Sequence, residues 1–472
     1  MRNMKNILFL SCLVACFLCA CTSSQSIEKT LKPRLVVLTD IAPADLEPDD
    51  QESLIRLLAH ADLYEIEAIV ATTGWNVGDY PVAWMDTIFN TLGAYEKDLP
   101  NLMKRSEQTS FLPIGKENQK QYIGYWPSID YLRSRVMLGS SKTGPKVLGE
   151  NNRSKGSDMI IQLADEADDR PIWISVWGGG NTLAQAIWQV KQTRTDKEFK
   201  DFLHKLRVYT VTDQDLSYHD RGKYELSSHM WMRELCGKDL FFMWDESAWQ
   251  TQNAIGSNSW NQYAEHIQGH GNLGARYPKN KYGVEGDTPS YLQSLPNGLH
   301  NPSNLNEIGW AGYYVWDNTL DQKTQCYTNT TPAVMQISRK YEHYFYPAIF
   351  ANFAARMDWA KEGKGNRNPI AIVNGKQGLD AIQVDTQSGK TVALDASKSY
   401  DPDGDALNYK WWVMPESGSY PGDVTVSDAD KSQASLTLPA DASGHTIHVI
   451  CEVTDTGVHT LKAYRRVIIT VK

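Results

Sequence analysis

The stretch that decides the fold runs from Arg34 to Leu58 and reads RLVVLTDIAPADLEPDDQESLIRLL. Its first six residues, Arg34–Thr39, form an apolar run that is typical of a strand buried on both faces. Residues Asp50–Asp62 then repeat apolar side chains every three or four positions, which predicts an amphipathic helix. A buried strand followed by such a helix is the opening unit of a parallel α/β sheet.

The alternation of strand and helix continues along the chain to about Met243. We predict further strands at 65–71, 171–176, 206–212 and 240–244, and further helices at 82–95, 157–168 and 182–192. This order predicts right-handed crossovers, a parallel sheet and a ligand at the carboxyl ends of its strands. Residues 250–345 are rich in Asn, Gly, Trp and Tyr, so we expect long loops with a few short elements over that face, and then a helix at 341–359.

The C-terminal part of the chain has a different periodicity. From Pro369 to Lys472, short alternating segments are separated by turns rich in Gly, Pro and Asp, which predicts a β-sandwich. The segments DASKSYDPDGD at 395–405 and YKWW at 409–412 resemble immunoglobulin-like or PKD-like domains. Asp401, Asp403 and Asp405 could ligate calcium or form a turn that caps backbone N–H groups. We favour the turn, because the loop lacks the full set of oxygen ligands of a strong site.

The N-terminus has the pattern of an export signal. Arg2 and Lys5 precede an apolar run that ends Leu18-Cys-Ala-Cys21. This end resembles a lipobox, which implies cleavage before Cys21 and a lipid anchor on its thiol. Thr22 after the cysteine resembles an outer-membrane address, so we predict an envelope lipoprotein. The predicted parts are a signal peptide at 1–20, a tether at 21–33, an α/β domain at 34–366 and a sandwich at 369–472.

The composition narrows the classes of partner. The chain of 472 residues has a formal net charge of -9, which argues against nucleic acid as a partner. Beyond the signal, Cys236, Cys326 and Cys451 are distant in sequence and odd in number, so no disulfide framework is implied. The 15 Trp and 23 Tyr suit the binding of sugar rings, but aromatic residues also fill cores.

Carboxylates gather directly after the first strand. Asp40 closes the strand, and Asp49 and Asp50 open the following helix. Clustered like charges cost free energy unless a cation is present, and calcium takes about six to eight oxygen ligands. The acids at the helix start could instead complement the helix dipole, but that does not account for Asp40 at a strand end. The segment therefore predicts a calcium site.

With this segment the chain resembles the nucleoside-hydrolase fold, and more closely its relatives known as cellulose-binding proteins, which join a nucleoside-hydrolase-like domain to a C-terminal sandwich. The resemblance implies an α/β fold with a mostly parallel sheet. It also implies that Asp40 and Asp50 ligate calcium and that Asp49 contacts sugar hydroxyls. ATTGWN at 71–76 resembles the second-strand motif, whose Asn, here Asn76, contacts the ligand.

Two later motifs complete the implied site. VWGGGNTLA at 176–184 resembles a turn whose backbone carbonyl, here that of Trp177, ligates the metal, and Asn181 in this turn is a candidate substrate contact. EGDTPS at 285–290 resembles the segment that supplies the last ligand, here Asp287, although Gly286 stands where one group has a His that helps the leaving group. VTDQD at 211–215 follows a strand on the ligand face. In this segment, we expect Asp213 and Asp215 either to contact the substrate or to cap the start of a helix.

The resemblance implies calcium-dependent hydrolysis of an N- or O-glycosyl bond. Asp40 or Asp49 would take the proton of the attacking water, and the reaction would pass through an oxocarbenium-like transition state. Asn76, Trp75 and Trp177 would orient the sugar. The predicted partners are a glycoside or polysaccharide fragment and a membrane.

The main alternative is a non-catalytic carbohydrate-binding lipoprotein, which the sandwich, the Trp content and Gly286 favour. A calcium-dependent esterase or phosphatase fits less well, because the sequence shows no Gly-x-Ser-x-Gly motif and no phosphate-cradling loop with Lys.

Overall fold

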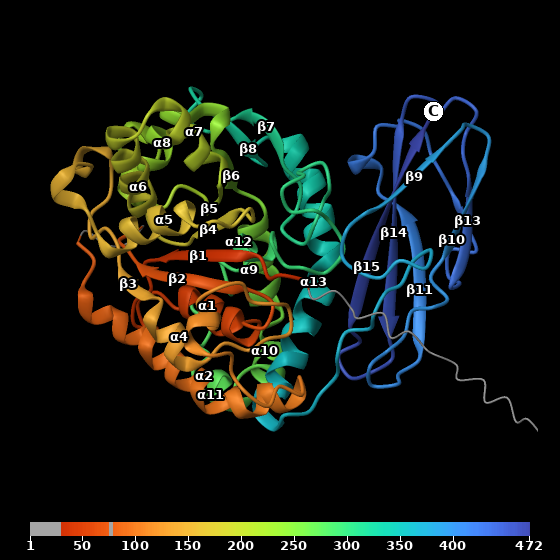
Figure 1. Cartoon of the computed structure of the whole chain (residues 1–472), viewed down its shortest axis with the longest axis horizontal. Helices are drawn as coiled ribbons and strands as arrows, with labels where there is room; N and C mark the ends of the chain where they lie inside the picture. The colour runs from red at the N-terminus through yellow and green to blue at the C-terminus, as the bar shows by residue number, and fades with distance from the viewer. Residues whose placement is uncertain (1–29, 75–78) are drawn as a thin grey trace, which may run out of the picture.

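The first domain is built on an eight-stranded sheet (Figure 1), seen in a computed structural model that describes residues 30–74 and 79–472. The strand order is β3-β2-β1-β4-β5-β6-β8-β7. The bounds are β1 Arg34–Thr39, β2 Glu65–Ala71, β3 Val136–Leu138, β4 Ile172–Val176, β5 Leu206–Val211, β6 Phe241–Asp245, β7 Val315–Asn318 and β8 Gln325–Thr328. Neighbouring strands are parallel, except that β7 is antiparallel to β8. The predicted mostly parallel α/β domain is therefore confirmed.

Strand β1 lies in the middle of the sheet, and its side chains alternate between two cores. Leu35 and Val37 pack in one core, and Val36 and Leu38 pack in the other, because successive residues of a strand point to opposite faces. The first core is covered by α1 Asp49–Ala59, α2 Met85–Arg105, α4 Ile129–Ser134 and α13 Pro332–Glu362. The second core is covered by α5 Lys155–Asp165, α6 Asn181–Thr193, α7 Asp196–His204 and α8 Ser228–Cys236. Helices thus cover both faces of the sheet.

The segment 250–345, where we predicted long loops with a few short elements, contains more helix than expected. It contains helices α9 Ala248–Asn258, α10 Trp260–His266, α11 Gly271–Ala275 and α12 Pro289–Leu292, as well as the edge strands β7 and β8. Helix α13 begins at Pro332, where proline is favoured in the first turn, and not at Tyr341. Ser, Asn and Gly give this segment a low helix propensity, and buried residues such as Tyr263 hold its helices by packing instead.

The C-terminal domain is a β-sandwich, as predicted. One sheet has three strands, β10 Thr391–Asp395, β13 Gln433–Thr437 and β12 Val426–Ser427, and the other has four, β11 Leu407–Val413, β14 Thr446–Asp455, β15 Lys462–Val471 and β9 Ile382–Thr386. Their inner faces form one apolar core that includes Trp411. In the 401–405 loop, Asp401 Oδ1 accepts hydrogen bonds from the backbone N–H groups of Asp403, at 2.7 Å, and Asp405, at 3.3 Å. These bonds are those of a capped turn.

The two domains pack against each other along α13, which lies between the sheet domain and the sandwich in Figure 1. The ring of Trp412 lies 6.3 Å from that of Tyr341 and 5.3 Å from that of Tyr344 on this helix. The guanidinium of Arg466 donates to the backbone carbonyl of Leu299 at 2.7 Å. Aromatic packing and buried hydrogen bonds therefore both hold the sandwich against the first domain.

Three acidic residues near this contact have basic partners, and we call them the domain seam: Asp358, Asp403 and Glu416. Asp403 binds Arg105 at 2.5 Å and Arg367 at 2.9 Å. Asp358 lies 3.0 Å from both His270 and His459. Glu416 binds Lys340 at 2.7 Å. Each acidic side chain of the seam therefore has at least one basic side chain as its partner.

Two further findings concern the cysteines and the membrane. Cys236, Cys326 and Cys451 are buried and form no disulfide. Within residues 30–74 and 79–472, no helix combines the length and the apolar character needed to cross a bilayer. The predicted signal segment, Cys21, Trp75 and Asn76 lie outside the described residues.

Candidate functional site

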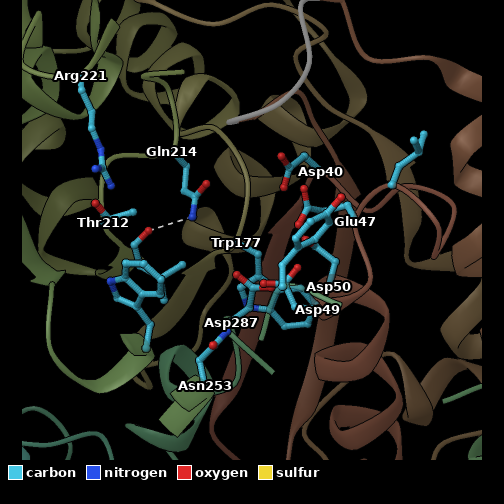
Figure 2. A pocket seen from close by; sticks show the side chains of 15 residues that line it. Asp40, Glu47, Asp49, Asp50, Trp177, Thr212, Gln214, Arg221, Asn253 and Asp287 are labelled. Carbon is cyan, nitrogen blue, oxygen red and sulfur yellow. Dashed lines mark hydrogen bonds between the residues drawn. The ribbon is translucent and has the colours of Figure 1, made fainter. Parts of the chain in front are cut away.

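A cavity of about 420 Å³ opens at the carboxyl ends of the central strands. Its lining includes one residue just after each of β1, β4 and β5, namely Asp40, Trp177 and Thr212. Asp49 and Asp50 at the start of α1 complete one wall. Figure 2 shows these carboxylates together with Asp287 on one side of the cavity, and Thr212, Gln214 and Arg221 on the other. The position agrees with the rule that parallel sheets bind ligands where their strands end.

Three carboxylates of this wall meet closely. Asp49, Asp50 and Asp287 each offer an oxygen, and these oxygens all lie within 4.8 Å of one another. Asp50 and Asp287 are buried. Carboxylate oxygens at this spacing, drawn from two distant segments of the chain, are a set that a hard divalent cation prefers.

The group is held in place by ordinary hydrogen bonds behind it. The hydroxyl of Thr39, at the end of β1, donates to Asp50 and accepts from the N–H of Ile41 at 3.0 Å. On the other segment, the hydroxyl of Ser290 donates to the backbone carbonyl of Asp287 at 2.5 Å. Strand β1 and the turn into α12 therefore fix the two halves of the group independently.

Asp40 lines the same cavity but is not part of the close group. The sequence predicted that Asp40, Asp50 and Asp287 share the ion, whereas the structure brings Asp49 into that position. Asp40 is enclosed by neighbouring glycines: a Cβ at Gly178 would lie 2.7 Å from its backbone nitrogen, and a Cβ at Gly74 would collide with its carboxylate. This close packing accounts for two of the glycines in the predicted motifs.

Among the described residues, the carboxylates of the group have no basic partner. Burial, and then the charges of Asp40 and Asp49, raise the pKa of Asp50. Burial, and then Asp50 and Asp49, raise the pKa of Asp287. Asp49 Oδ1 and Asp287 Oδ2 are buried and have no hydrogen-bond partner within the described part of the chain. Buried oxygens of this kind are costly unless something binds them, so the residues present fit a divalent cation.

Asp40 shows the same effect. Burial, and then the charges of Glu47 and Asp49, raise the pKa of the Asp40 carboxyl. A carboxyl group with a raised pKa beside a cavity has the properties of a general base.

Trp177 has a structural side chain. Its indole is almost completely buried, and Nε1 donates to Ser290 Oγ at 2.8 Å and to Ser175 Oγ at 3.0 Å. Because these bonds orient the ring within the core, we do not propose it as a platform for a sugar. The role of the Trp177 carbonyl as a metal ligand stays a prediction.

Gly286 has a steric reason to be glycine. A Cβ at this position would lie 2.6 Å from Asp49 Oδ2. A histidine at 286, as in one nucleoside-hydrolase group, would therefore displace Asp49. Glycine at position 286 therefore allows Asp49 to occupy its place in the close group.

Three predicted substrate contacts do not line the cavity. Asn181 exchanges two hydrogen bonds of 2.8 Å with the backbone of Gly144. Asp213 accepts from Ser227 at 2.6 Å, and Asp215 accepts from the N–H of Ser228 at 2.6 Å, next to the first turn of α8. Their side chains are engaged in the scaffold, so the cap interpretation of Asp213 and Asp215 agrees with the geometry.

Sequence reasoning located the segment 211–215 but not the residues that face the cavity. Thr212 and Gln214 line it, and they alternate with Asp213 and Asp215. Trp249, Asn253 and Tyr282 also line it and were not predicted. Asn253 and Tyr282 lie in the segment 250–345, where we expected mainly long loops, and Trp249 directly precedes it. The abundance of Trp and Tyr was the one signal that pointed to such residues.

Beneath the group lies a further pair that the sequence did not reveal. Arg56 in α1 forms a buried ion pair with Glu285, whose φ is +56°. The N–H of Glu285 donates to Glu52 Oε2 at 2.8 Å, and Tyr277 donates to its carboxylate at 2.9 Å. A non-glycine residue in this conformation needs support from its surroundings, and these contacts fix the backbone two residues before Asp287.

Comparisons with known proteins agree with this architecture. A family model described as cellulose-binding Sde182, nucleoside hydrolase-like domain, matches residues 34–314, and one described as cellulose-binding protein Sde0182, C-terminal domain, matches residues 391–471. A solved structure from Saccharophagus degradans, a nucleoside hydrolase-related hypothetical protein associated with carbohydrate metabolism, is similar over 93% of this chain and 100% of that chain. It shares 33% sequence identity, with a TM-score of 0.77.

Two other comparisons add nothing to the argument. The PKD domain of the KIAA 1837 protein covers 23% of this chain and 92% of that chain at 19% identity, and its TM-score of 0.17 is too low to support a likeness. No curated protein sequence matches the chain.

Proposed function

This chain belongs to the family of the cellulose-binding Sde182 nucleoside hydrolase-like domain, and we propose that it is a calcium-dependent hydrolase of a glycosyl bond. The ligand would be a glycoside or a polysaccharide fragment. The observation that carries the proposal is the group of Asp49, Asp50 and Asp287, whose oxygens lie within 4.8 Å of one another. It lies in the cavity where the strands end, and a catalytic site in this fold belongs there.

Asp49, Asp50 and Asp287 would hold the ion, and the Trp177 carbonyl is a candidate for a further ligand. When bound, calcium supplies a positive charge that orients sugar hydroxyls and makes a nearby water more acidic. The ion would also neutralise the repulsion that raises the pKa values of Asp50 and Asp287.

The residues of the chain would perform the remaining work. Asp40 lines the cavity beside the group, and its carboxylate would take the proton of the water that attacks the anomeric carbon. Asp49, with an oxygen left without a partner, would contact a sugar hydroxyl or serve as the base in place of Asp40. The negative charge of this wall would stabilise an oxocarbenium-like transition state.

The second candidate function is carbohydrate binding without turnover. Gly286 favours it, because glycine has no side chain to protonate a leaving group, and a Cβ at this position would force Asp49 to shift. The family name, cellulose-binding, points in the same direction. Both candidates use the same cavity, so activity separates them.

The test is the release of sugar from a panel of N- and O-glycosides, with calcium and with a chelator. The hydrolase proposal expects release that needs calcium and falls by about 100- to 10,000-fold in Asp40→Asn or Asp49→Asn. Asp403→Asn, at the domain seam, is the matched control and should keep full activity. Binding of a sugar without any release would support the second candidate instead.

We further propose that the protein is an envelope lipoprotein anchored through Cys21, the residue that would become the N-terminus after cleavage of the signal. Labelling of cells with a radioactive fatty acid should mark the wild-type protein and not Cys21→Ala. Fractionation would then test the outer-membrane address that Thr22 suggests. Equal labelling of both proteins would contradict the anchor.

A further inference from the structure

The mouth of the cavity carries exposed apolar side chains next to its acidic wall. Tyr282 is 69% exposed and Leu46 is 50% exposed, and both line the cavity. They belong to two loops, one that follows β1 and one that leads to Asp287. A large aromatic ring that remains exposed beside a polar cavity gains free energy only when a ligand covers it.

The two loops are tied together by Lys281. Its ammonium group donates to the backbone carbonyl of Asp45 and lies 4.8 Å from the centre of the Tyr282 ring. The ring is therefore held by a cation–π contact and by a link to the opposite loop. An aromatic platform that is fixed before the ligand arrives loses less conformational entropy on binding.

The chemistry of the lining limits what this platform accepts. Asp40, Glu47, Asp49, Asp50 and Asp287 make the adjoining wall acidic. Arg221 on the other wall (Figure 2) and one bound calcium ion would offset only part of that charge, so phosphorylated or acidic ligands are disfavoured. The cavity of about 420 Å³ lies toward the small end of ligand pockets, about 300–1,000 Å³. A neutral ligand that is longer than the cavity must continue past its mouth, where Tyr282 and Leu46 lie.

The sandwich offers no comparable platform among the described residues. Trp411 is buried in its core, and Trp412 packs against α13. Tyr400, 46% exposed, is the large aromatic residue that the sandwich leaves most exposed in the described chain. Binding of a sugar by aromatic stacking is therefore better placed at the cavity mouth than on the C-terminal domain.

We infer that Tyr282, supported by Leu46, forms a second sugar subsite, which stacks the sugar residue next to the one held in the acidic cavity. The ligand is then a neutral oligosaccharide or the end of a polysaccharide chain, and not an isolated nucleoside. The inference rests on the proposed function in one respect, that the cavity holds a sugar.

The test measures binding by isothermal titration calorimetry in calcium, with glucose, cellotriose and adenosine as probes. Wild-type protein should bind cellotriose more tightly than glucose, and Tyr282→Ala should weaken cellotriose binding by about 3- to 10-fold. The affinity for glucose should not change. Tyr282→Trp should keep the preference for the longer sugar, and Tyr400→Ala is the control with an exposed tyrosine on the sandwich.

The outcomes separate this inference from the proposed function. Equal binding of glucose and cellotriose by wild-type protein, or no binding of cellotriose, would overturn the subsite whether or not glycosides are hydrolysed. An equal loss for cellotriose in Tyr400→Ala would move binding to the sandwich, and a loss confined to adenosine would assign the ring to a nucleobase. A Tyr282-dependent preference without sugar release would keep the subsite and refute the hydrolase.

Discussion

The acidic residues of the cavity and those of the domain seam are the same kind of side chain in opposite surroundings. Burial, and then neighbouring carboxylates, raise the pKa values of Asp50 and Asp287. At the seam, burial alone would raise the pKa of Asp403, but hydrogen bonds from Arg105 and Arg367 outweigh it and lower the pKa. The seam pairs its carboxylates with basic side chains, whereas Asp49, Asp50 and Asp287 have no basic partner in the part of the chain that the structure describes.

The difference teaches how to tell a structural acid from a functional one. A buried carboxylate with a basic partner can be explained by stability, and its partner is visible in the fold. A group of buried carboxylates without one works against folding, so its presence needs another reason. Substitutions in either region test whether the paired and the unpaired carboxylates differ in this way.

The largest expected effect comes from the pair that lies beneath the cavity. Arg56→Met would leave Glu285 buried without its partner, at a cost of about 3–5 kcal/mol in the free energy of unfolding. Denaturation in urea would measure it. The double variant Arg56→Met with Glu285→Gln should recover part of the loss, and a loss below about 1 kcal/mol for the single variant would show that the pair is not needed.

The next effect is a change in the free energy of unfolding that has opposite signs in the two regions. In a chelator, Asp50→Asn removes one of several repelling charges and should raise the free energy of unfolding by about 1–4 kcal/mol. Asp403→Asn removes a paired charge and should lower it by up to about 1 kcal/mol. Thermal and urea unfolding of both variants would check this. Changes of the same sign would remove the contrast.

A smaller effect concerns pH at the seam. Burial alone would raise the pKa of Asp358, but His459 and His270 outweigh it and hold the pKa below its usual value. A carboxyl with a lowered folded pKa stabilises the protein above its unfolded pKa, about 3.9, and loses that contribution as the pH falls through the folded pKa. The free energy of unfolding should therefore fall less steeply in Asp358→Asn than in wild type as the pH drops from 5. Identical slopes would contradict this role.

The smallest effect is expected in the sandwich loop. Asp405→Asn should leave calcium binding unchanged, because the neighbouring Asp401 accepts backbone hydrogen bonds as in a capped turn and Asp403 is bound by arginines. Calcium titration of this variant would measure it. A reduced amount of bound calcium would show that the 401–405 loop, which contains Asp403 of the seam, is a second calcium site.

Much of the fold could be read from the sequence, because strand β1 and helix α1 have strong and different periodicities. The same segment also revealed the acidic wall. Sequence alone could not tell that Asp49 rather than Asp40 joins the close group, since this depends on how Asp287 approaches from a distant turn. It could not reveal Tyr282 either, because the position of that loop is set by tertiary contacts such as the one between Lys281 and Asp45.

The helices from 248 to 292 were missed for a related reason. Their Ser, Asn and Gly residues give a weak local signal. Packing against α13 holds α9, α10 and α11, and α12 packs against β4, β5 and α9. The sequence also located the segment 211–215 at the cavity wall. Alternate residues of this segment face opposite sides, and their charge alone suggested Asp213 and Asp215 as the substrate contacts. Thr212 and Gln214 occupy the side that faces the cavity.

The central claim is that Asp49, Asp50 and Asp287 hold a divalent cation, and titration of calcium into metal-free protein by calorimetry tests it most directly. Wild-type protein should bind a single ion, Asp50→Ala should weaken that binding by more than about 100-fold, and Asp403→Ala should bind as wild type does. Undiminished calcium affinity in both Asp50→Ala and Asp287→Ala would contradict the account.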